Sequence, residues 1–264
     1  MGQLDGKVAI VTGAGRGIGR AIATGYLQEG ASVVVTAARE QAELDWFFQQ
    51  EWSQRVLAQL ADVSDAHACE QLVAHALQRF GKVDVLVNNA GRGMKYVSSS
   101  FMTQPTPFWE VDPHTWRMII ATNVDGPFYM TRAVVPPMLQ RGIGSVINIS
   151  INYATMKRRG FSPYGPSKAA LESETAIWAQ DLEESGIRVN ILLPGGATNT
   201  GMIPAGSLQE VRDNLLQPEI MVAPAVFLAS DASRSLTGRR LVATEWSLSS
   251  SAGKAVADGI GQRP

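Results

Sequence analysis

The sequence contains little cysteine and histidine, and this scarcity narrows the chemistry open to the chain. Among 264 residues there is one cysteine, Cys69, and there are three histidines. A single cysteine excludes an internal disulfide, and the histidines are scattered without metal-ligand spacing relative to Cys69. We therefore expect no metal site and look for chemistry carried by other side chains.

The sequence also lacks an excess of positive or negative charge. Lysine and arginine number 23, aspartate and glutamate number 24, and the formal net charge is −1. Binding to nucleic acid needs a strong basic excess, so a nucleic-acid partner is not expected. No apolar run approaches the roughly 18 residues that cross a bilayer, and the first residues lack the pattern of a signal peptide. The expected partner is a small molecule, with no membrane contact, and the expected location is the cytoplasm.

What the sequence does contain is a regular alternation of strand and helix patterns. Several strand-like runs are apolar almost throughout, which indicates burial on both faces and hence a parallel sheet. Alternating strands and helices form right-handed βαβ units. The prediction is an α/β fold, a doubly wound Rossmann-type parallel β-sheet of about seven strands flanked by helices. The predicted strands are residues 7–12, 31–37, 54–61, 83–89, 144–150, 187–193 and 239–244.

Composition and length predict one domain and a tail. Hydrophobic residues make up 45% and charged residues 18%, which is typical of a soluble globular protein with a full core. We assign this single domain to residues 1–246. Residues 247–264 are rich in serine, alanine and glycine, and they are predicted to form a weakly ordered tail or a segment ordered only by a neighbouring subunit.

Three glycines, Gly13, Gly17 and Gly19, stand between the first strand and the first helical pattern. A strand that turns directly into a helix presents the first N–H groups of that helix, and these groups bind a pyrophosphate. Glycine is needed there because phosphate oxygens must come close to the backbone. Their place at the first strand–helix junction predicts a dinucleotide-binding site rather than a plain turn.

The spacing Gly-x-x-x-Gly-x-Gly, preceded by Thr12, resembles the short-chain dehydrogenase/reductase family of the classical type. Further motifs of that family follow in order over nearly the whole chain. They are ADVSD (61–65), NNAG (88–91), TNVDGPF (122–128), VINIS (146–150), YGPSK (164–168) and LLPGGATNT (192–200). The resemblance implies an NAD(P)-dependent enzyme that interconverts a carbonyl and a secondary alcohol.

The same resemblance implies which residues contact the cofactor. Asp62, after the third strand, is expected beside the adenine, and Lys168 is expected to bind the nicotinamide ribose. The expected cofactor-binding set is Gly13, Arg16, Gly17, Ile18, Gly19, Arg39, Asp62, Val63, Asn89, Ala90, Gly91, Tyr164, Lys168, Pro194 and Gly195.

The choice between NADP and NAD depends on the end of the second strand. Enzymes that prefer NAD usually carry an acid there, which binds the ribose hydroxyls. Here Ala37 and Ala38 occupy that position, and Arg39 and Arg16 lie nearby. Two guanidiniums suit a 2′-phosphate, although both side chains could instead point into solvent. The prediction is that NADP(H) is preferred and that NAD(H) remains an alternative.

Two tyrosine–lysine pairs with four-residue spacing lie close together in the chain, and their context separates them. Tyr164 and Lys168 begin a long helical pattern, so they share a face near its first turns. Tyr153 and Lys157 are followed by RRGFSP, which is typical of a loop. We therefore predict that Tyr164 and Lys168 are catalytic and that the first pair is a coincidence of spacing.

Carbonyl reduction explains why such a pair is needed. A proton must reach the oxygen as hydride arrives at the carbon. A free tyrosine has a pKa near ~10, and the lysine ammonium and the oxidised nicotinamide are both expected to lower the pKa of Tyr164 because they favour the phenolate. The family resemblance adds Asn123, which is expected to help hold a water that relays the proton.

The donor to the substrate oxygen is the least determined part of the predicted site. In the family, a serine usually stands 13 positions before the tyrosine, and here that residue is Ile151. Ser150 and Asn152 flank it, and a shift of one residue at a strand end turns a side chain to the other face. Three alternatives stay open. A one-residue loop insertion restores Ser150, which we take as the catalytic prediction; Asn152 replaces it; or the site lacks this donor.

Two segments are candidates for the walls of a substrate pocket. The segment from Gly91 to Trp116 is longer than in many family members and is predicted to form a lid or wall or, equally, a surface loop or subunit contact. The second candidate is residues 197–215. Apolar residues near the site predict a bulky, mainly apolar ketone or a 3-oxoacyl-type substrate; they are Met156, Phe161, Met202 and Ile203. The basic run 157–159 is either solvated or attracts an anion such as a phosphopantetheine group.

The predicted function is thus hydride transfer between NADP(H) and a carbonyl or secondary alcohol. One alternative is an NAD-linked alcohol or polyol dehydrogenase, and another is a nucleotide-binding sensor or scaffold with little turnover. The family resemblance also implies a homodimer or homotetramer, formed through long helices predicted at about residues 112–140 and 166–185.

Overall fold

The computed structural model describes residues 2–204, 213–247 and 254–255. Within these residues, eight strands form one sheet in the order β3-β2-β1-β4-β5-β6-β7-β8. The strands are β1 (Val8–Val11), β2 (Ser32–Ala37), β3 (Val56–Leu60), β4 (Val85–Asn88), β5 (Gly144–Ile149), β6 (Ile187–Leu193), β7 (Arg239–Val242) and β8 (Lys254–Ala255). The helices are α1 (Gly17–Gln28), α2 (Ala42–Asp45), α3 (Ala66–Phe80), α4 (Pro113–Ile120), α5 (Gly126–Arg141), α6 (Tyr153–Met156), α7 (Tyr164–Asp181) and α9 (Val222–Ala229).

The parallel sheet matches the fold predicted from the apolar strand patterns. Strands β1 to β7 pair with one another only in parallel, and each lies inside a predicted run. The doubly wound α/β fold with seven parallel strands is therefore confirmed. The two residues of β8 add an antiparallel pairing to β7 at the edge of the sheet. The rest of the predicted tail, residues 248–253 and 256–264, lies outside the described residues.

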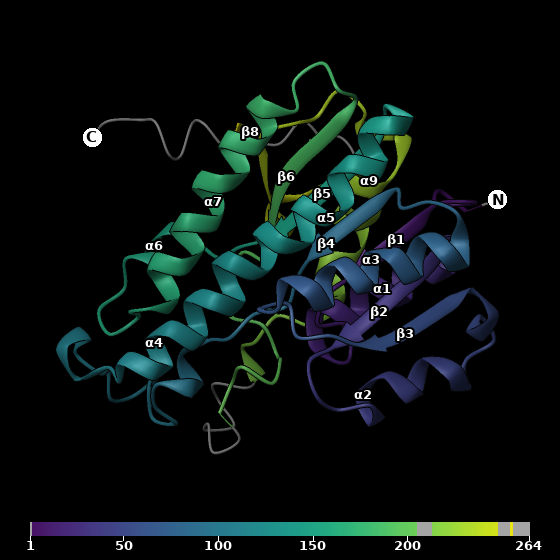
Figure 1. Ribbon diagram of the computed structural model, residues 1–264. Helices are drawn as coiled ribbons and strands as arrows, with labels where there is room; N and C mark the ends of the chain where they lie inside the picture. Colours follow the sequence, from purple (N-terminus) through teal and green to yellow (C-terminus); the bar gives the residue numbers. More distant parts are fainter. Residues whose placement is uncertain (1, 205–212, 248–253, 256–264) are drawn as a thin grey trace.

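Helices cover both faces of the sheet, as Figure 1 shows. On one face, Ile22, Tyr26 and Leu27 of α1 pack with α9 in one apolar cluster. On the other face, α3, α5 and α7 contribute to a second cluster, to which Cys69 belongs. Both faces of the central strands are thus buried, which is why their sequences are apolar almost throughout.

The long helix predicted at residues 112–140 is interrupted. A π-helical turn at Ala121–Asp125 separates α4 from α5, and Asn123 lies in this turn with no exposed surface. Irregular turns of this kind are frequent at functional sites. The helix predicted at 166–185 begins two residues earlier, at Tyr164, and ends at Asp181. In the described part of the chain, no helix has the length and apolar character that a membrane span requires.

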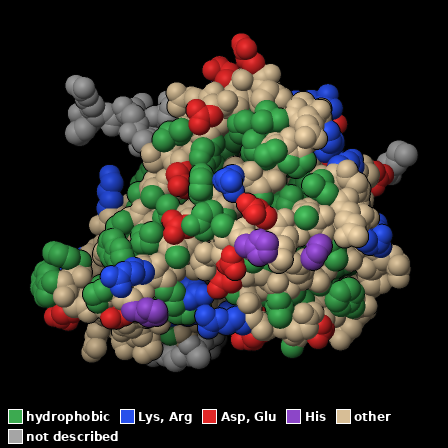
Figure 2. Space-filling view, in the orientation of Figure 1, with side chains coloured by type: hydrophobic (Ala, Val, Ile, Leu, Met, Phe, Trp, Pro, Cys, Tyr) green, Lys and Arg blue, Asp and Glu red, His purple; other side chains and the backbone are tan. Residues whose placement is uncertain are grey.

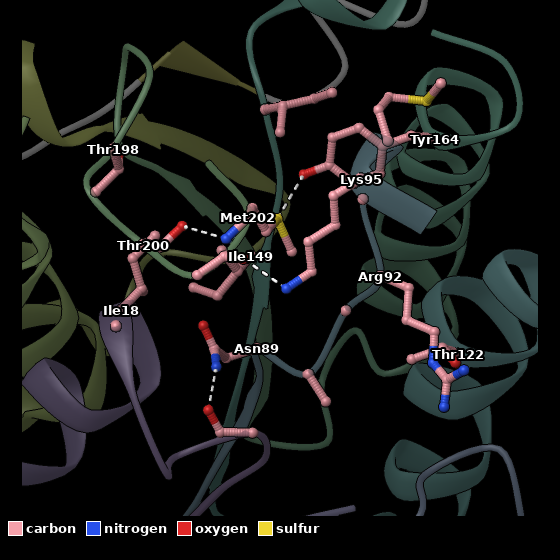
Figure 3. A pocket seen from close by; sticks show the side chains of 18 of the residues that line it. Ile18, Asn89, Arg92, Lys95, Thr122, Ile149, Tyr164, Thr198, Thr200 and Met202 are labelled. Atoms are coloured by element: carbon pink, nitrogen blue, oxygen red, sulfur yellow. Dashed lines mark hydrogen bonds between the residues drawn. The ribbon is translucent and has the colours of Figure 1, made fainter. Parts of the chain in front are cut away.

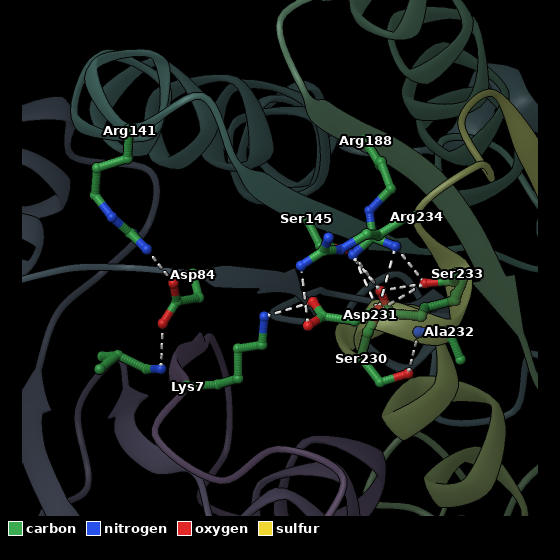
Figure 4. A network of polar contacts seen from close by, with 12 residues as sticks. Lys7, Asp84, Arg141, Ser145, Arg188, Ser230, Asp231, Ala232, Ser233 and Arg234 are labelled. Atoms are coloured by element: carbon green, nitrogen blue, oxygen red, sulfur yellow. Dashed lines mark hydrogen bonds and ion pairs between the residues drawn. The ribbon is translucent and has the colours of Figure 1, made fainter.

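The amino-terminal edge of the sheet carries a closed polar network, shown in Figure 4. Asp84 is 5% exposed and accepts hydrogen bonds from the Val8 amide at 2.8 Å and from Arg141 at 2.6 Å. Burial alone would raise the pKa of Asp84, but these bonds and Lys82 outweigh it and lower that pKa. The side chain of Lys7 pairs with Asp231 at 2.8 Å. This network joins β1, β4, α5 and the segment after α9.

The opposite, carboxyl-terminal edge positions the site. Strand β1 lies between β2 and β4, so the chain order reverses there. In sheets of this kind, ligands bind outside the carboxyl ends of the strands at such a switch point. The loops that follow β1, β2, β4, β5 and β6 all leave from this edge because the strands are parallel.

Candidate active site

A cavity of about 510 Å³ opens at the carboxyl edge of the sheet. All of the residues predicted to bind cofactor or catalyse line it, except Gly19 and Asn123. The lining residues of this predicted set are Gly13, Arg16, Gly17, Ile18, Arg39, Asp62, Val63, Asn89, Ala90, Gly91, Ser150, Tyr164, Lys168, Pro194 and Gly195. Figure 3 shows part of this cavity from close by. The topology therefore brings together residues that are far apart in the sequence.

The glycine turn has the shape of a pyrophosphate cradle. Gly13 and Gly17 have φ angles of +62° and +54°, a region that favours glycine. Gly19 is needed for packing instead, because a Cβ there would lie 2.3 Å from the carbonyl oxygen of Gly13. Helix α1 begins at Gly17, and Arg16 before it makes no side-chain cap. Because the Arg16 side chain does not cap the helix, the first N–H groups of α1 can bind a ligand. The turn therefore has a geometry that suits a dinucleotide phosphate.

The end of β4 is tied to the glycine turn by hydrogen bonds. The Asn89 side chain donates to the carbonyl oxygens of Thr12 at 2.8 Å and Gly13 at 3.0 Å. The Thr12 hydroxyl accepts from the amides of Asn89 and Ala90, both at 3.0 Å. These bonds hold the two loops that form the floor of the cavity in one arrangement.

Asp62 lies at the adenosine end of the cavity, after β3. Its carboxylate accepts from the Ser64 hydroxyl at 2.7 Å and faces Arg92 at 3.6 Å. Partial burial alone would raise the pKa of Asp62, but the Ser64 hydrogen bonds and the arginines 92 and 39 lower it overall. The side chain is therefore an anion at neutral pH.

The end of β2 carries no acidic residue, in agreement with the sequence. However, an acidic residue of α2 lies close to this strand end. Ala37 closes β2 and is 5% exposed. Glu43 pairs with Arg16 at 2.8 Å, and its carboxylate lies against the glycine turn at Gly15. Arg39 lines the cavity and has no ion pair among the described residues. Sequence reasoning missed Glu43 because nothing in its local pattern shows that α2 folds back over the turn.

Tyr164 and Lys168 occupy the first turns of α7, on one face and against the cavity. The Lys168 ammonium donates to the carbonyl oxygen of Ile149 at 2.8 Å. The Tyr164 hydroxyl faces the Met202 sulfur at 3.9 Å, as Figure 3 shows. Tyr153, of the other tyrosine–lysine pair, lies in the short helix α6 and does not line the cavity, and its buried hydroxyl interacts with Glu172.

The electrostatics of the pair differ from the expectation for the tyrosine. Burial raises the pKa of Tyr164 to about 12. The expected lowering by Lys168 is not seen, because the ammonium is directed to the Ile149 carbonyl. Burial also lowers the pKa of Lys168 to about 8, and Glu172 opposes that change. At neutral pH the tyrosine therefore holds a proton that it can donate, and the lysine is charged.

Asn123 is buried behind the cavity. Its amide oxygen accepts from the Arg92 backbone N–H at 2.8 Å, and its amide nitrogen donates to the Arg92 carbonyl at 2.9 Å. The same nitrogen donates to the Ser167 hydroxyl at 2.9 Å. Asn123, in the π-helical turn before α5, thus joins the loop after β4 to the first turn of α7.

The three residues 150–152 differ in what their side chains do. The Ser150 hydroxyl is 2% exposed and donates to the Glu172 carboxylate at 2.6 Å. A hydroxyl has one donor, so this bond uses it. Asn152 lines the cavity and donates one amide hydrogen to the Gly195 carbonyl at 2.8 Å, which leaves its second amide hydrogen available. Ile151 stands between them and offers no donor.

The far end of the cavity is apolar and aromatic. Phe101 and Phe161 meet edge to face with ring centroids 5.9 Å apart. Met102, Met202 and Ile203 line the same cavity, whereas Met156 is buried but does not line it. The segment after Gly91 thus has two parts. Its first part, to Met102, lines the cavity, and its second part exposes Phe108 and Trp109, each 71% exposed.

The second predicted wall segment also contributes. Thr198 to Ile203 line the cavity, except Asn199, and the Lys95 ammonium donates to the carbonyl oxygen of Gly201. Residues 205–212 of this segment lie outside the described residues. In the basic run, Arg158 lines the cavity and stacks over Phe161 at 5.0 Å. Lys157 and Arg159 are exposed and do not line it.

Comparison with known proteins places the chain in a family. Residues 7–210 match the family model described as short chain dehydrogenase. An uncharacterized oxidoreductase of Mycobacterium tuberculosis is 36% identical over 91% of this chain and 92% of its own length. A 3-oxoacyl-[acyl-carrier-protein] reductase of Thermotoga maritima is 30% identical over 90% and 96%, and a galactitol 2-dehydrogenase of Cereibacter sphaeroides is 33% identical over 89% and 92%.

A solved structure agrees with this placement. A Burkholderia xenovorans protein, assigned to the short-chain dehydrogenase/reductases, superposes with a TM-score of 0.78 at 31% identity, covering 92% of this chain and 96% of that one. Together with the fold and the cavity, these matches show that the chain belongs to the short-chain dehydrogenase family. It is an oxidoreductase of the NAD(P)-dependent kind, which confirms the family predicted from the motifs.

Proposed function

We propose that the enzyme transfers hydride between NADP(H) and a bulky, mainly apolar ketone or 3-oxoacyl-type compound, with the matching secondary alcohol on the other side of the reaction. The observation that carries this proposal is the place of Tyr164 and Lys168. Both line the cavity that the glycine turn opens into, between the dinucleotide cradle and the aromatic end. A substrate carbonyl at this boundary would lie within reach of a proton donor and of a bound cofactor.

The nicotinamide, when bound, supplies or accepts the hydride. Tyr164 holds a proton at neutral pH and donates it to the developing alkoxide, and takes it back in the reverse direction. Lys168 stays charged at neutral pH, and its ammonium is held at the Ile149 carbonyl, from where it would bind the nicotinamide ribose. Asn123 fixes the loop after β4 against α7 and thereby holds the proton path in place.

For the substrate oxygen we favour Asn152 over Ser150. The single donor of Ser150 is bonded to a buried carboxylate, whereas Asn152 keeps one amide hydrogen at the cavity. The sequence-based assignment of Ser150 stays a prediction, and its geometry counts against it. An amide donor can stabilise a developing oxyanion in the same way as a hydroxyl.

For the cofactor, we propose NADP(H) on the basis of Arg39. The end of β2 offers no carboxylate to the ribose, and Arg39 lines the cavity without a carboxylate partner in the described residues. A guanidinium pairs well with a 2′-phosphate. Arg16 is less suited than the sequence indicates, because Glu43 already neutralises it.

The mainly apolar substrate is supported by the far end of the cavity. Phe101, Phe161 and Met202 offer apolar surface that a polyol would cover at a cost, because its hydroxyls would lose water without gaining partners. Arg158 at the same end would accept an anionic group on such a substrate. These features favour a 3-oxoacyl-type compound over a sugar.

The direct test is a cofactor-oxidation assay with a panel of ketones, 3-oxoacyl thioesters and sugar ketones, run with NADPH and with NADH. We expect turnover of the apolar ketones or thioesters and a higher kcat/KM with NADPH. Turnover of the sugar ketones alone, and with NADH, would instead support an NAD-linked polyol dehydrogenase.

A second candidate function is a nucleotide-binding sensor with little turnover, and Ile151 is the observation that favours it. Ile151 stands where the family usually has a serine and removes a donor from the site. Tight NADPH binding without oxidation by any carbonyl of the panel would support the sensor and contradict the enzyme proposed here.

We also propose a homodimer or homotetramer in the cytoplasm. Large apolar side chains are exposed on three helices, among them Trp116 of α4, Phe128 of α5 and Ile177 of α7. Figure 2 shows hydrophobic side chains along the face that α5 and α7 form. Exposed apolar patches of this kind are typical of protein contacts. Light scattering of the purified protein tests this proposal directly.

A further inference from the structure

A buried charged group lies directly behind the proposed catalytic pair. Glu172 is 1% exposed and stands on α7 one turn after Lys168, so the two side chains share a helix face. One oxygen of Glu172 accepts from the Ser150 hydroxyl at 2.6 Å and from Arg240 of β7 at 3.2 Å. Four elements meet at this carboxylate: the end of β5, α6, α7 and β7.

Arg240 extends this arrangement to the segment that follows β5. It donates to the carbonyl oxygen of Ile151 at 2.9 Å, and its guanidinium lies 4.0 Å from the ring centroid of Tyr153. Its side chain is 12% exposed. We call the group formed by Ser150, Ile151, Tyr153, Glu172 and Arg240 the Glu172 assembly.

We propose that Glu172 and Arg240 are positioning residues for the reaction: Glu172 supports the charge of Lys168, and Arg240 fixes the Ile151 segment from which Asn152 reaches the substrate oxygen. This inference rests on the proposed function for its meaning in catalysis. It concerns residues that contact neither substrate nor cofactor and act through Lys168 and the chain at residues 150–152.

Stability alone does not account for such a group. A buried ion pair is often no more stabilising than apolar residues of the same volume, because both charges lose water. Here the buried carboxylate also interacts with the Tyr153 hydroxyl, so one charge contacts side chains from three other segments. The arrangement is better explained by what it does to its neighbours.

The charges around Lys168 show what Glu172 contributes. Lys168 is 4% exposed, and the nearest titratable residues on its own helix are Tyr164 and Glu172, each four residues away. Burial lowers the pKa of Lys168, while Glu172 raises it and so keeps the lysine charged closer to neutral pH. Around Glu172 itself stand Ser150, Tyr153 and Arg240, and burial together with Glu172 raises the pKa of Tyr153 to about 12.

Substitutions of Glu172 and Arg240 should have different effects that can be measured separately. Replacing Glu172 by glutamine removes a negative charge from beside Lys168, so the ammonium loses its proton at lower pH. Replacing Arg240 by lysine keeps the positive charge but loses the guanidinium that donates to the Ile151 carbonyl. The first change therefore acts on the pH profile, and the second acts on the binding of the substrate oxygen.

The closing experiment uses the intact protein with ¹³Cε-labelled lysine. The sequence holds six lysines, so the spectrum is simple, and Lys168→Met assigns the signal of interest. In Glu172→Gln we expect the titration midpoint of Lys168 to fall by about one unit or more. In Arg240→Lys the midpoint stays close to that of the wild type. Glu183→Gln, an exposed glutamate beyond the same helix, is the matched control and should leave the midpoint unchanged.

Kinetics complete the test. The alkaline limb of kcat/KM should move to lower pH in Glu172→Gln, whereas in Arg240→Lys the limb stays and KM for the carbonyl rises by about tenfold. An unmoved Lys168 midpoint in Glu172→Gln overturns the proposal. If that variant does not fold, Glu172→Asp replaces it, and an intermediate midpoint is expected because the charge stays but moves away. Failure of the wild type to reduce any carbonyl refutes the proposed function instead, and the lysine spectrum still reports on Glu172.

Discussion

The two edges of the sheet use charged residues in different ways. At the amino edge, Asp84 and Asp231 meet Lys7 and Arg141 in direct ion pairs, and the buried Arg188 is bonded to carbonyl oxygens and the Ser233 hydroxyl. At the carboxyl edge, Arg16 and Glu43 also pair, but among the described residues the Tyr164 hydroxyl meets only the Met202 sulfur and Arg39 has no ion pair. At the amino edge the charged groups are bonded to one another, and at the carboxyl edge several polar groups face the cavity without such partners.

We infer that the amino edge contributes mainly to the stability of the fold, whereas the carboxyl edge contributes mainly to binding and catalysis. Closed networks lock neighbouring elements because every buried polar atom is satisfied. Open polar groups are left where a ligand supplies the missing partners. Substitutions at the amino edge should therefore change the free energy of unfolding, and those at the carboxyl edge should change binding and turnover.

The largest effect on stability is expected at Asp84. Asp84→Ala leaves Arg141 and the Val8 amide without their buried acceptor, and we expect a loss of about 3 kcal/mol in the free energy of unfolding. Urea unfolding measures it. Asp231→Ala is the control, since its carboxylate is 54% exposed and should cost less than about 1 kcal/mol. A fall in NADPH affinity in the folded Asp84→Ala protein would contradict the claim that the amino edge affects stability and not binding.

The next effect concerns the substrate oxygen. Asn152→Ala should lower kcat by about 10²-fold because an oxyanion donor is lost. Ser150→Ala should lower kcat by less than about tenfold, since it removes only a bond to Glu172. Steady-state kinetics with the best substrate of the panel decide between them. A collapse of kcat in Ser150→Ala with Asn152→Ala unaffected would reverse our choice of donor.

A smaller effect is expected at the adenosine end. Arg39→Ala should lower the NADPH-to-NADH ratio of kcat/KM by about tenfold, because a charge-assisted bond to the 2′-phosphate is lost. Glu43→Gln should act in the opposite direction, since it frees Arg16. Kinetic constants for both cofactors in both variants test this. No change in either ratio would mean that the adenosine end does not choose the cofactor.

The smallest effect is a pH dependence of stability from Lys168. Its pKa is lowered by burial from 10.5 to about 8, so between these values the unfolded chain holds a proton that the folded protein lacks. Stability therefore rises with pH through this window. The difference in unfolding free energy between the wild type and Lys168→Met, measured from pH 8 to 10, isolates the effect. If the difference in unfolding free energy stays constant or falls over this range, the lowered pKa of the buried Lys168 is contradicted.

Local pattern was enough to predict most of the fold and the cofactor cradle. Apolar runs mark β1 to β7, and the glycines at one strand–helix junction mark the dinucleotide turn, because both depend on residues close in sequence. The seven parallel strands are confirmed, while the individual site residues remain predictions that the cavity gathers together.

Contacts between residues that are far apart in the sequence could not be predicted from local pattern. Glu172 and Arg240 are 68 residues apart, and only the folded sheet brings β7 over α7. The Ser150 hydroxyl is likewise bonded to Glu172, which spacing alone does not reveal. Glu43 is a similar case, since its helix folds back over the glycine turn. The one sequence signal for Glu172 is its four-residue spacing from Lys168, and it gains meaning only once Lys168 is known to be buried.

The most direct test of the account compares the two tyrosines. Tyr164→Phe and Tyr153→Phe each remove one hydroxyl, and both changes leave the helix positions intact. We predict that Tyr164→Phe lowers kcat by about 10³-fold with NADPH affinity and unfolding free energy unchanged, whereas Tyr153→Phe keeps kcat within about threefold of the wild type. Equal turnover in Tyr164→Phe and the wild type, or a loss confined to Tyr153→Phe, would contradict the catalytic role proposed for Tyr164.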